Sequence, residues 1–86
     1  MKPVKIYTSP ICPYCTRAKR LLDAKRVPYE EIDVSGDDQA RMDLAARTGM
    51  RTVPQIFIGE HHVGGSDELH ALEREGKLDA LLAMNQ

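Results

Sequence analysis

The sequence predicts an α/β protein with one mixed, four-stranded sheet and helices on both faces. A strand, a helix and a strand follow one another within about thirty residues, and such a unit makes its two strands parallel. Two strand-like runs further on are separated by only two residues, which indicates a hairpin. Helical patterns precede and follow the hairpin, so helices are available to cover both faces of the sheet.

The first three elements follow from hydrophobic periodicity. Residues 4–8 are β-branched and aromatic and are followed by a Ser-Pro pair, which is typical of a strand that ends there. From Tyr14 onward the apolar positions have the spacing of one helix face, with basic residues on the other side. Pro13 suits the first helical position, where a missing N–H costs nothing. Residues 29–34 predict the second strand.

A second helix is expected between the turn residues 35–38 and Gly49. The acids of this turn favour a helix N-terminus, and the glycine favours a stop. We expect the inward side of this helix to carry Met42, Ala45 and Ala46.

The hairpin and two further helices complete the predicted order. Residues 55–58 and 61–63 have the pattern of strands, and the Gly59-Glu60 pair between them fits a type II′ turn. A third helix is expected to open after Gly64-Gly65 with Ser66 as its cap. Three leucines predict a last short helical turn packed on the core: Leu78, Leu81 and Leu82.

Length and composition exclude several classes of protein. A chain of 86 residues has room for one domain, which we expect to span residues 1–86, and 42% apolar with 29% charged residues is ordinary for a soluble protein. The longest uncharged stretch, residues 6–16, has eleven residues, whereas a membrane span needs roughly 20. The start lacks the apolar core of a signal peptide. We therefore expect a cytoplasmic protein that binds no membrane.

Charge is distributed unevenly along the chain. The net charge of -1 argues against a nucleic-acid binder. Residues 1–26, however, carry seven basic groups against one acid, a net charge of +6, and the remainder carries -7. Both cysteines lie in the positive part.

The Cys12 and Cys15 pair is the first candidate site. Two cysteines are too few for a disulfide framework, and a C-x-x-C in a cytosolic chain indicates redox or metal chemistry. A thiolate at a helix N-terminus is favoured by free N–H groups and by the macrodipole. We expect Cys12 to be the attacking thiolate and Cys15, one turn later on the buried side, to be the resolving thiol.

Simpler explanations apply to two features. Half of a Cys₄ zinc site would need partners, and His61, His62 and His70 lie far along the chain without a further cysteine, so we expect no metal. Pro54 can be explained as a strand-entry residue, and because only about 5–6% of X-Pro bonds are cis, a trans bond is the expectation from the residues alone.

Three motifs together resemble a known family. Cys-Pro-Tyr-Cys at residues 12–15, Thr-Val-Pro at 52–54 and Gly-Gly-Ser-Asp at 64–67 are similar to those of the small bacterial dithiol glutaredoxins. The resemblance covers essentially the whole chain, with the motifs in the same order and spacing. It implies a thioredoxin fold with a cis Val53-Pro54 bond beside Cys12.

The resemblance also implies a glutathione groove. The N–H and C=O groups of Val53 would pair with the cysteinyl backbone of glutathione. The N–H groups of Ser66 and Asp67 suit its γ-glutamyl carboxylate, and the Asp67 carboxylate suits the adjacent ammonium group. Without the family match, a plainly capped helix explains this last motif equally well. The groove would be lined by Tyr14, which could equally pack on the core, and by Thr52, Val53, Pro54, Gly65, Ser66 and Asp67.

One position departs from the family pattern. Glutaredoxins of this kind usually have a lysine three residues before the first cysteine, where this chain has Ser9. Arg41 and Arg51 are the candidates to replace it at the glycyl carboxylate of glutathione, and both are equally well explained as surface arginines.

The predicted function is that of a glutathione-dependent thiol–disulfide oxidoreductase. It would act as a monomer on glutathione mixed disulfides and on protein disulfides, without metal or organic cofactor, because sulfur carries the electrons. A redoxin reduced by thioredoxin reductase is disfavoured by the motif at residues 64–67. A carrier of a glutathione-ligated [2Fe–2S] cluster is disfavoured by Pro13 and Cys15.

Overall fold

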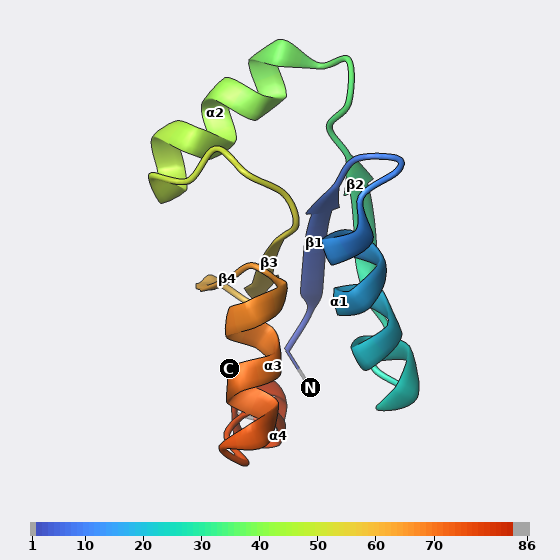
Figure 1. Ribbon diagram of the computed structural model, residues 1–86. Helices are drawn as coiled ribbons and strands as arrows, with labels where there is room; N and C mark the ends of the chain where they lie inside the picture. The colour runs from blue at the N-terminus through green and yellow to red at the C-terminus, as the bar shows by residue number, and fades with distance from the viewer. Residues whose placement is uncertain (1, 84–86) are drawn as a thin grey trace.

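The computed structural model describes residues 2–83, which form one sheet with helices packed around it (Figure 1). No helix in this range is long and apolar enough to span a bilayer. The elements follow the predicted order: β1 Val4–Thr8, α1 Pro13–Ala24, β2 Glu30–Asp33, α2 Asp38–Thr48, β3 Gln55–Ile58, β4 His61–Gly64, α3 Ser66–Arg74 and α4 Leu78–Ala83.

The sheet is mixed and has the strand order β2-β1-β3-β4. Strand β1 pairs in parallel with β2 and antiparallel with β3, and β3 pairs antiparallel with β4. The strand, helix and strand unit therefore makes the predicted parallel pair. Gly59, in the two-residue turn between β3 and β4, has a φ of 61°, as the first central residue of a type II′ turn requires.

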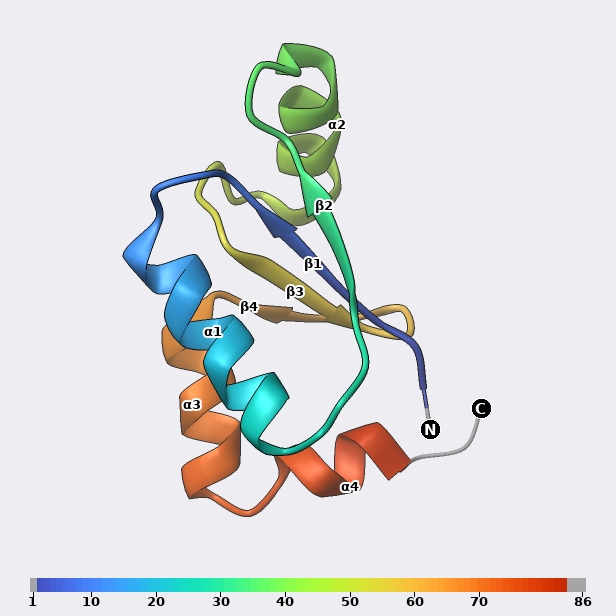
Figure 2. The same ribbon diagram turned by 90° about the vertical axis from the view of Figure 1, so that its right-hand side faces the viewer.

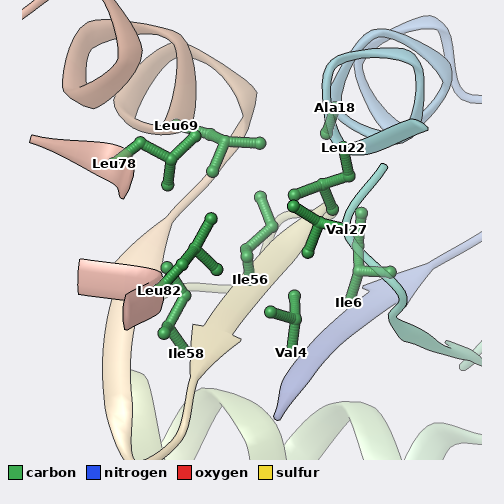
Figure 3. Packing of buried hydrophobic residues seen from close by; sticks show 10 residues of the cluster. All are labelled: Val4, Ile6, Ala18, Leu22, Val27, Ile56, Ile58, Leu69, Leu78 and Leu82. Atoms are coloured by element: carbon green, nitrogen blue, oxygen red, sulfur yellow. The ribbon is translucent and has the colours of Figure 1, made fainter. Parts of the chain in front are cut away.

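The hydrophobic core lies between the sheet and helices α1, α3 and α4 (Figure 3). Alternate residues of β1 and β3 point into it, and α1 and α3 lie side by side over them. The last helix packs back on this core as predicted, since Leu78 and Leu82 are buried. The core residues are Val4, Ile6, Ala18, Leu22, Val27, Ile56, Ile58, Leu69, Leu78 and Leu82.

Helix α2 lies on the opposite side of the sheet, near the carboxyl ends of β1 and β2 (Figure 2). Its contact with that face includes the Arg47 guanidinium, which lies 5.1 Å from the centre of the Phe57 ring. The prediction of its inward side was wrong for Met42, which is 65% exposed, and for Ala46, which is also exposed. Leu44 is the buried residue instead. Alanines occur on several sides of α2 itself, so the spacing of its apolar residues does not define one buried face.

Helix α3 differs from the prediction at its cap. Gly65, rather than Ser66, is the N-cap residue, and its N–H donates a 2.7 Å hydrogen bond to the Glu68 carboxylate. Ser66 is the first helical residue and is buried. A serine side chain enclosed in this way is not placed to cap the helix, so the returning glutamate satisfies the N-terminal donor instead.

Candidate active site

Three loops meet beside the start of α1. The thiol of Cys12 lies 3.9 Å from the carbonyl oxygen of Val53, to which it donates. A Cβ atom added to Gly65 would lie 3.4 Å from the carbonyl oxygen of Pro54. The structure thus brings together the start of α1, the loop before β3 and the start of α3, which are far apart in the sequence.

Cys12 is the N-cap residue of α1, as predicted. Its backbone is extended, with a φ of -128°, and its sulfur accepts a 3.2 Å hydrogen bond from the N–H of Cys15. Pro13 occupies the first turn, where it has no donor to leave unpaired. A negative charge on the Cys12 sulfur is therefore favoured both by a backbone donor and by the positive end of the helix.

Cys15 has a different environment from Cys12. Its side chain is 2% exposed, whereas Cys12 is half-buried, and both cysteines are free thiols. Burial, together with a hydrogen bond to Cys12, raises the pKa of the Cys15 thiol to about 11. The pair thus consists of one accessible sulfur and one enclosed thiol that is protonated at neutral pH.

The rim around Cys12 contains exposed apolar and aromatic groups. Ile11 is fully exposed and has a φ of 53°, a conformation that costs free energy for a β-branched residue. The Tyr14 ring is 54% exposed and lies 5.9 Å from the Arg17 guanidinium, so it does not pack in the core. Ile11 was not predicted from the sequence, because an isolated apolar residue between prolines has no periodic signal.

The loop before β3 brings a backbone edge to the cysteines. The Val53-Pro54 bond is cis, as the resemblance implied and against the expectation from the residues alone. Thr52 is exposed and Val53 is partly exposed, whereas Pro54 is buried. The partly exposed Val53 therefore lies next to the Cys12 thiol, which donates to its carbonyl oxygen.

The start of α3 forms the third side of the site. The N–H of Gly65 is occupied by Glu68, and the N–H groups of Ser66 and Asp67 follow in the first turn, where helical donors lack intrahelical partners. Gly64 has a φ of 117°, and a Cβ there would lie 3.0 Å from the Glu68 side chain. The positive φ therefore favours glycine at position 64, and a Cβ there would in addition crowd the Glu68 side chain.

Arg41 lies on α2, and Arg51 lies in the loop that follows it. Both are exposed and line one cavity of about 840 Å³ on α2 and the loop that follows it. Among the described residues, its lining includes Asp38 but no residue of the cysteine motif. Within residues 2–83, no three metal-binding side chains are grouped as a candidate metal site.

Comparison with known proteins assigns this arrangement to a family. The family model described as Glutaredoxin matches residues 4–63. The chain belongs to the glutaredoxin family. A glutaredoxin of Pseudomonas aeruginosa is 60% identical over 83 residues, which cover 96% of this chain and 99% of that protein.

Solved glutaredoxin structures have the same fold. The solution structure of glutaredoxin from Brucella melitensis is 56% identical, with a TM-score of 0.86, covering 95% of this chain and 89% of that one. The crystal structure of a buckwheat glutaredoxin–glutathione complex is 36% identical, with a TM-score of 0.89, and the match covers 94% of this chain and 76% of that one. The predicted thioredoxin fold is confirmed, and membership of the glutaredoxin family supports the predicted function of a glutathione-dependent thiol–disulfide oxidoreductase.

Proposed function

We propose that this glutaredoxin reduces glutathione mixed disulfides and protein disulfides with electrons from glutathione. The observation that carries the proposal is the contrast between the two sulfurs. The half-buried Cys12 sulfur accepts a 3.2 Å hydrogen bond from the N–H of Cys15. Cys15 itself is enclosed, with a pKa of about 11. Attack by Cys12 and later resolution by Cys15 follow from that difference.

The reaction with a mixed disulfide needs Cys12 alone. Its thiolate attacks the glutathione sulfur, the original S–S bond breaks, and the substrate leaves as a thiolate that takes up a proton. Cys12 is now bonded to glutathione. The thiolate of a second glutathione attacks the glutathione sulfur of this intermediate, which releases Cys12 and forms glutathione disulfide.

The reaction with a protein disulfide uses both cysteines. Cys12 attacks one sulfur and forms a mixed disulfide with the protein, whose second sulfur leaves and is protonated. Cys15 then loses its proton and attacks the Cys12 sulfur, which releases the protein dithiol and forms the Cys12–Cys15 disulfide. Two glutathione molecules restore the dithiol and leave as glutathione disulfide.

Glutathione would bind across the three loops that meet at Cys12. The backbone of Val53 offers one donor and one acceptor for the cysteinyl unit, and the first-turn N–H groups of Ser66 and Asp67 suit the γ-glutamyl carboxylate. The Asp67 carboxylate would take the ammonium group. Arg41 and Arg51 are the proposed partners of the glycyl carboxylate. The similarity to the buckwheat glutaredoxin–glutathione complex supports this ligand class.

The test is a coupled assay with two electron sources. We expect glutathione with glutathione reductase to sustain reduction of a glutathionylated peptide, and thioredoxin reductase to give no turnover. The matched control is Cys12→Ser, which keeps the fold and lacks the nucleophile. Turnover with thioredoxin reductase but not with glutathione would contradict the proposal. We further propose that the chain acts as a monomer in the cytoplasm, where thiols are kept reduced.

A further inference from the structure

Gln55 is a buried polar residue at the beginning of β3. Its side chain is 1% exposed, although it starts a strand whose other residues are all apolar. It follows Pro54 directly and pairs with Tyr7 of β1 in the sheet. Burying an amide is unfavourable unless its donors and acceptors are satisfied, so its hydrogen bonds identify its role.

Both protons of the Gln55 amide are donated to the preceding loop. Nε2 donates to the carbonyl oxygen of Met50 at 2.9 Å and to that of Thr52 at 3.0 Å. These two carbonyls lie on the chain that leads into the cis Val53-Pro54 bond. The side chain thus reaches back across the proline and fixes the backbone immediately before Val53.

The same loop is fixed at its other end by Thr48. The Thr48 hydroxyl accepts a 3.1 Å hydrogen bond from the N–H of Met50 and donates to the carbonyl oxygen of Leu44 at 3.0 Å. Met50 is therefore held from both sides, by the last turn of α2 and by Gln55. The loop has no regular secondary structure, so these side-chain bonds define its position.

The remaining polar atom of Gln55 argues against a role in stability alone. Among residues 2–83, Oε1 of Gln55 is buried and has no hydrogen-bond partner. A buried acceptor without a partner destabilises the folded state, and an apolar side chain of the same length would not have this cost. An apolar residue at this position would make the core more stable. The amide is explained by the two carbonyl groups, of Met50 and Thr52, that it holds in place.

We propose that Gln55 is a positioning residue for substrate binding, which aims the backbone of Val53 at the ligand held beside Cys12. The inference rests on the proposed function, because it assumes that glutathione pairs with Val53. Gln55 acts through Met50 and Thr52 and does not contact the reacting sulfurs. Its loss weakens recognition of the glutathione unit and leaves the nucleophile intact.

The test variant is Gln55→Met, which keeps the length of the side chain and removes both donors. We expect the KM for a glutathionylated peptide to rise roughly tenfold, about the effect of one or two net hydrogen bonds. The kcat and the rate of Cys12 alkylation by iodoacetamide should stay within about twofold, because the helix start is untouched. A KM within about twofold of the parent in a folded variant would overturn the inference.

Thr8→Val is the matched control. Thr8 is buried to a similar degree, and its replacement removes a 2.8 Å hydrogen bond to Glu31 without changing the shape of the side chain. A general loss of stability would affect both variants, whereas only Gln55→Met should raise the KM. An equal rise in Thr8→Val would refute a positioning role.

A second variant covers the case in which Gln55→Met does not fold. Gln55→Glu places a carboxylate against two carbonyl oxygens, and protonation at lower pH restores one donor. The ratio of the KM of Gln55→Glu to the KM of the parent should therefore decrease as the pH is lowered from 8 to 5. A ratio independent of pH would count against the inference. Absence of glutathione-dependent turnover in the parent would instead contradict the proposed function.

Discussion

The ammonium nitrogen of Lys19 lies 3.0 Å from Oε2 of Glu31 and so connects helix α1 to the edge strand β2. The same oxygen accepts a 2.8 Å hydrogen bond from the buried Thr8 hydroxyl. The hydrogen bond from Lys19 has the largest effect on the pKa of the Glu31 carboxyl, and the bond from Thr8 has the next largest. Both hold this pKa below its usual value of 4.5. The ionised form of Glu31 therefore stabilises the fold.

The ion pair between Lys19 and Glu31 predicts that the stability of the fold depends on pH. Because the folded pKa of Glu31 is lowered, its contribution is present above about pH 4.5 and is lost as the pH falls through the lower, folded value. Glu31→Gln should reduce the free energy of unfolding at pH 7 and have less effect near pH 3. Urea unfolding at both values measures this difference. Glu30→Gln, on the same strand, is the control for the change in charge. If Glu31→Gln reduced the free energy of unfolding equally at both pH values, the prediction would be contradicted.

Cys12→Ser should abolish all thiol transfer. Cys12 is the half-buried cysteine at the helix start, and Cys15 is enclosed, so no second attacking thiolate is available in the pair. The measurement is glutathione-coupled turnover of a glutathionylated peptide and of a protein disulfide. Turnover of either substrate that persists in this variant would disprove the assignment of the nucleophile.

Cys15→Ser should separate the two reactions. Reduction of glutathione mixed disulfides needs only Cys12 and should continue, whereas reduction of protein disulfides needs a resolving thiol and should be lost. Parallel assays with both substrates measure the separation. If both activities vanished in a folded variant, the proposed division of roles would be wrong.

Alkylation should distinguish the two thiols of the reduced protein. With a pKa of about 11 and 2% exposure, Cys15 is both protonated and inaccessible at neutral pH. We expect iodoacetamide at pH 7 to modify Cys12 completely before Cys15 reacts, as measured by mass spectrometry of the peptides. Equal modification of both cysteines at this pH would contradict the burial of Cys15.

Asp67→Ala and Arg41→Ala should each raise the KM for glutathione. Each variant removes a charge-assisted contact, which is worth roughly 1.5–3 kcal/mol when well formed. Arg51→Ala tests the alternative arginine in the same cavity. Arg74→Ala removes a charge from the far end of α3 and serves as the control. An unchanged KM in all three groove variants would refute the proposed glutathione groove.

Much of the fold was predictable from periodicity and turn chemistry. The strand at Val4–Thr8 and the helix that begins at Pro13 follow from side-chain spacing and proline geometry, and the structure has both. Met42 was placed wrongly, because α2 covers only part of its sheet face and most of its surface meets solvent. Helix spacing indicates which residues share a face but not how much of that face is covered.

The site was predictable only where a local motif determines the geometry. Cys12 at a helix start is a local feature, and its hydrogen bond to the Cys15 N–H follows from it. The contacts of Gln55 with Met50 and Thr52 depend on the path of a loop, and no periodic signal reveals them. The cavity shared by Arg41 and Arg51 likewise depends on how α2 meets the chain that follows it.

The bond from the Cys15 N–H to the Cys12 sulfur also affects the balance between oxidation states. It favours a negatively charged sulfur, and a sulfur in a disulfide carries no such charge. The interaction therefore stabilises the dithiol relative to the disulfide and makes the oxidised protein the stronger oxidant. The helix start that makes Cys12 reactive thus also favours return to the dithiol, so that a weak monothiol reductant can regenerate the protein after each cycle.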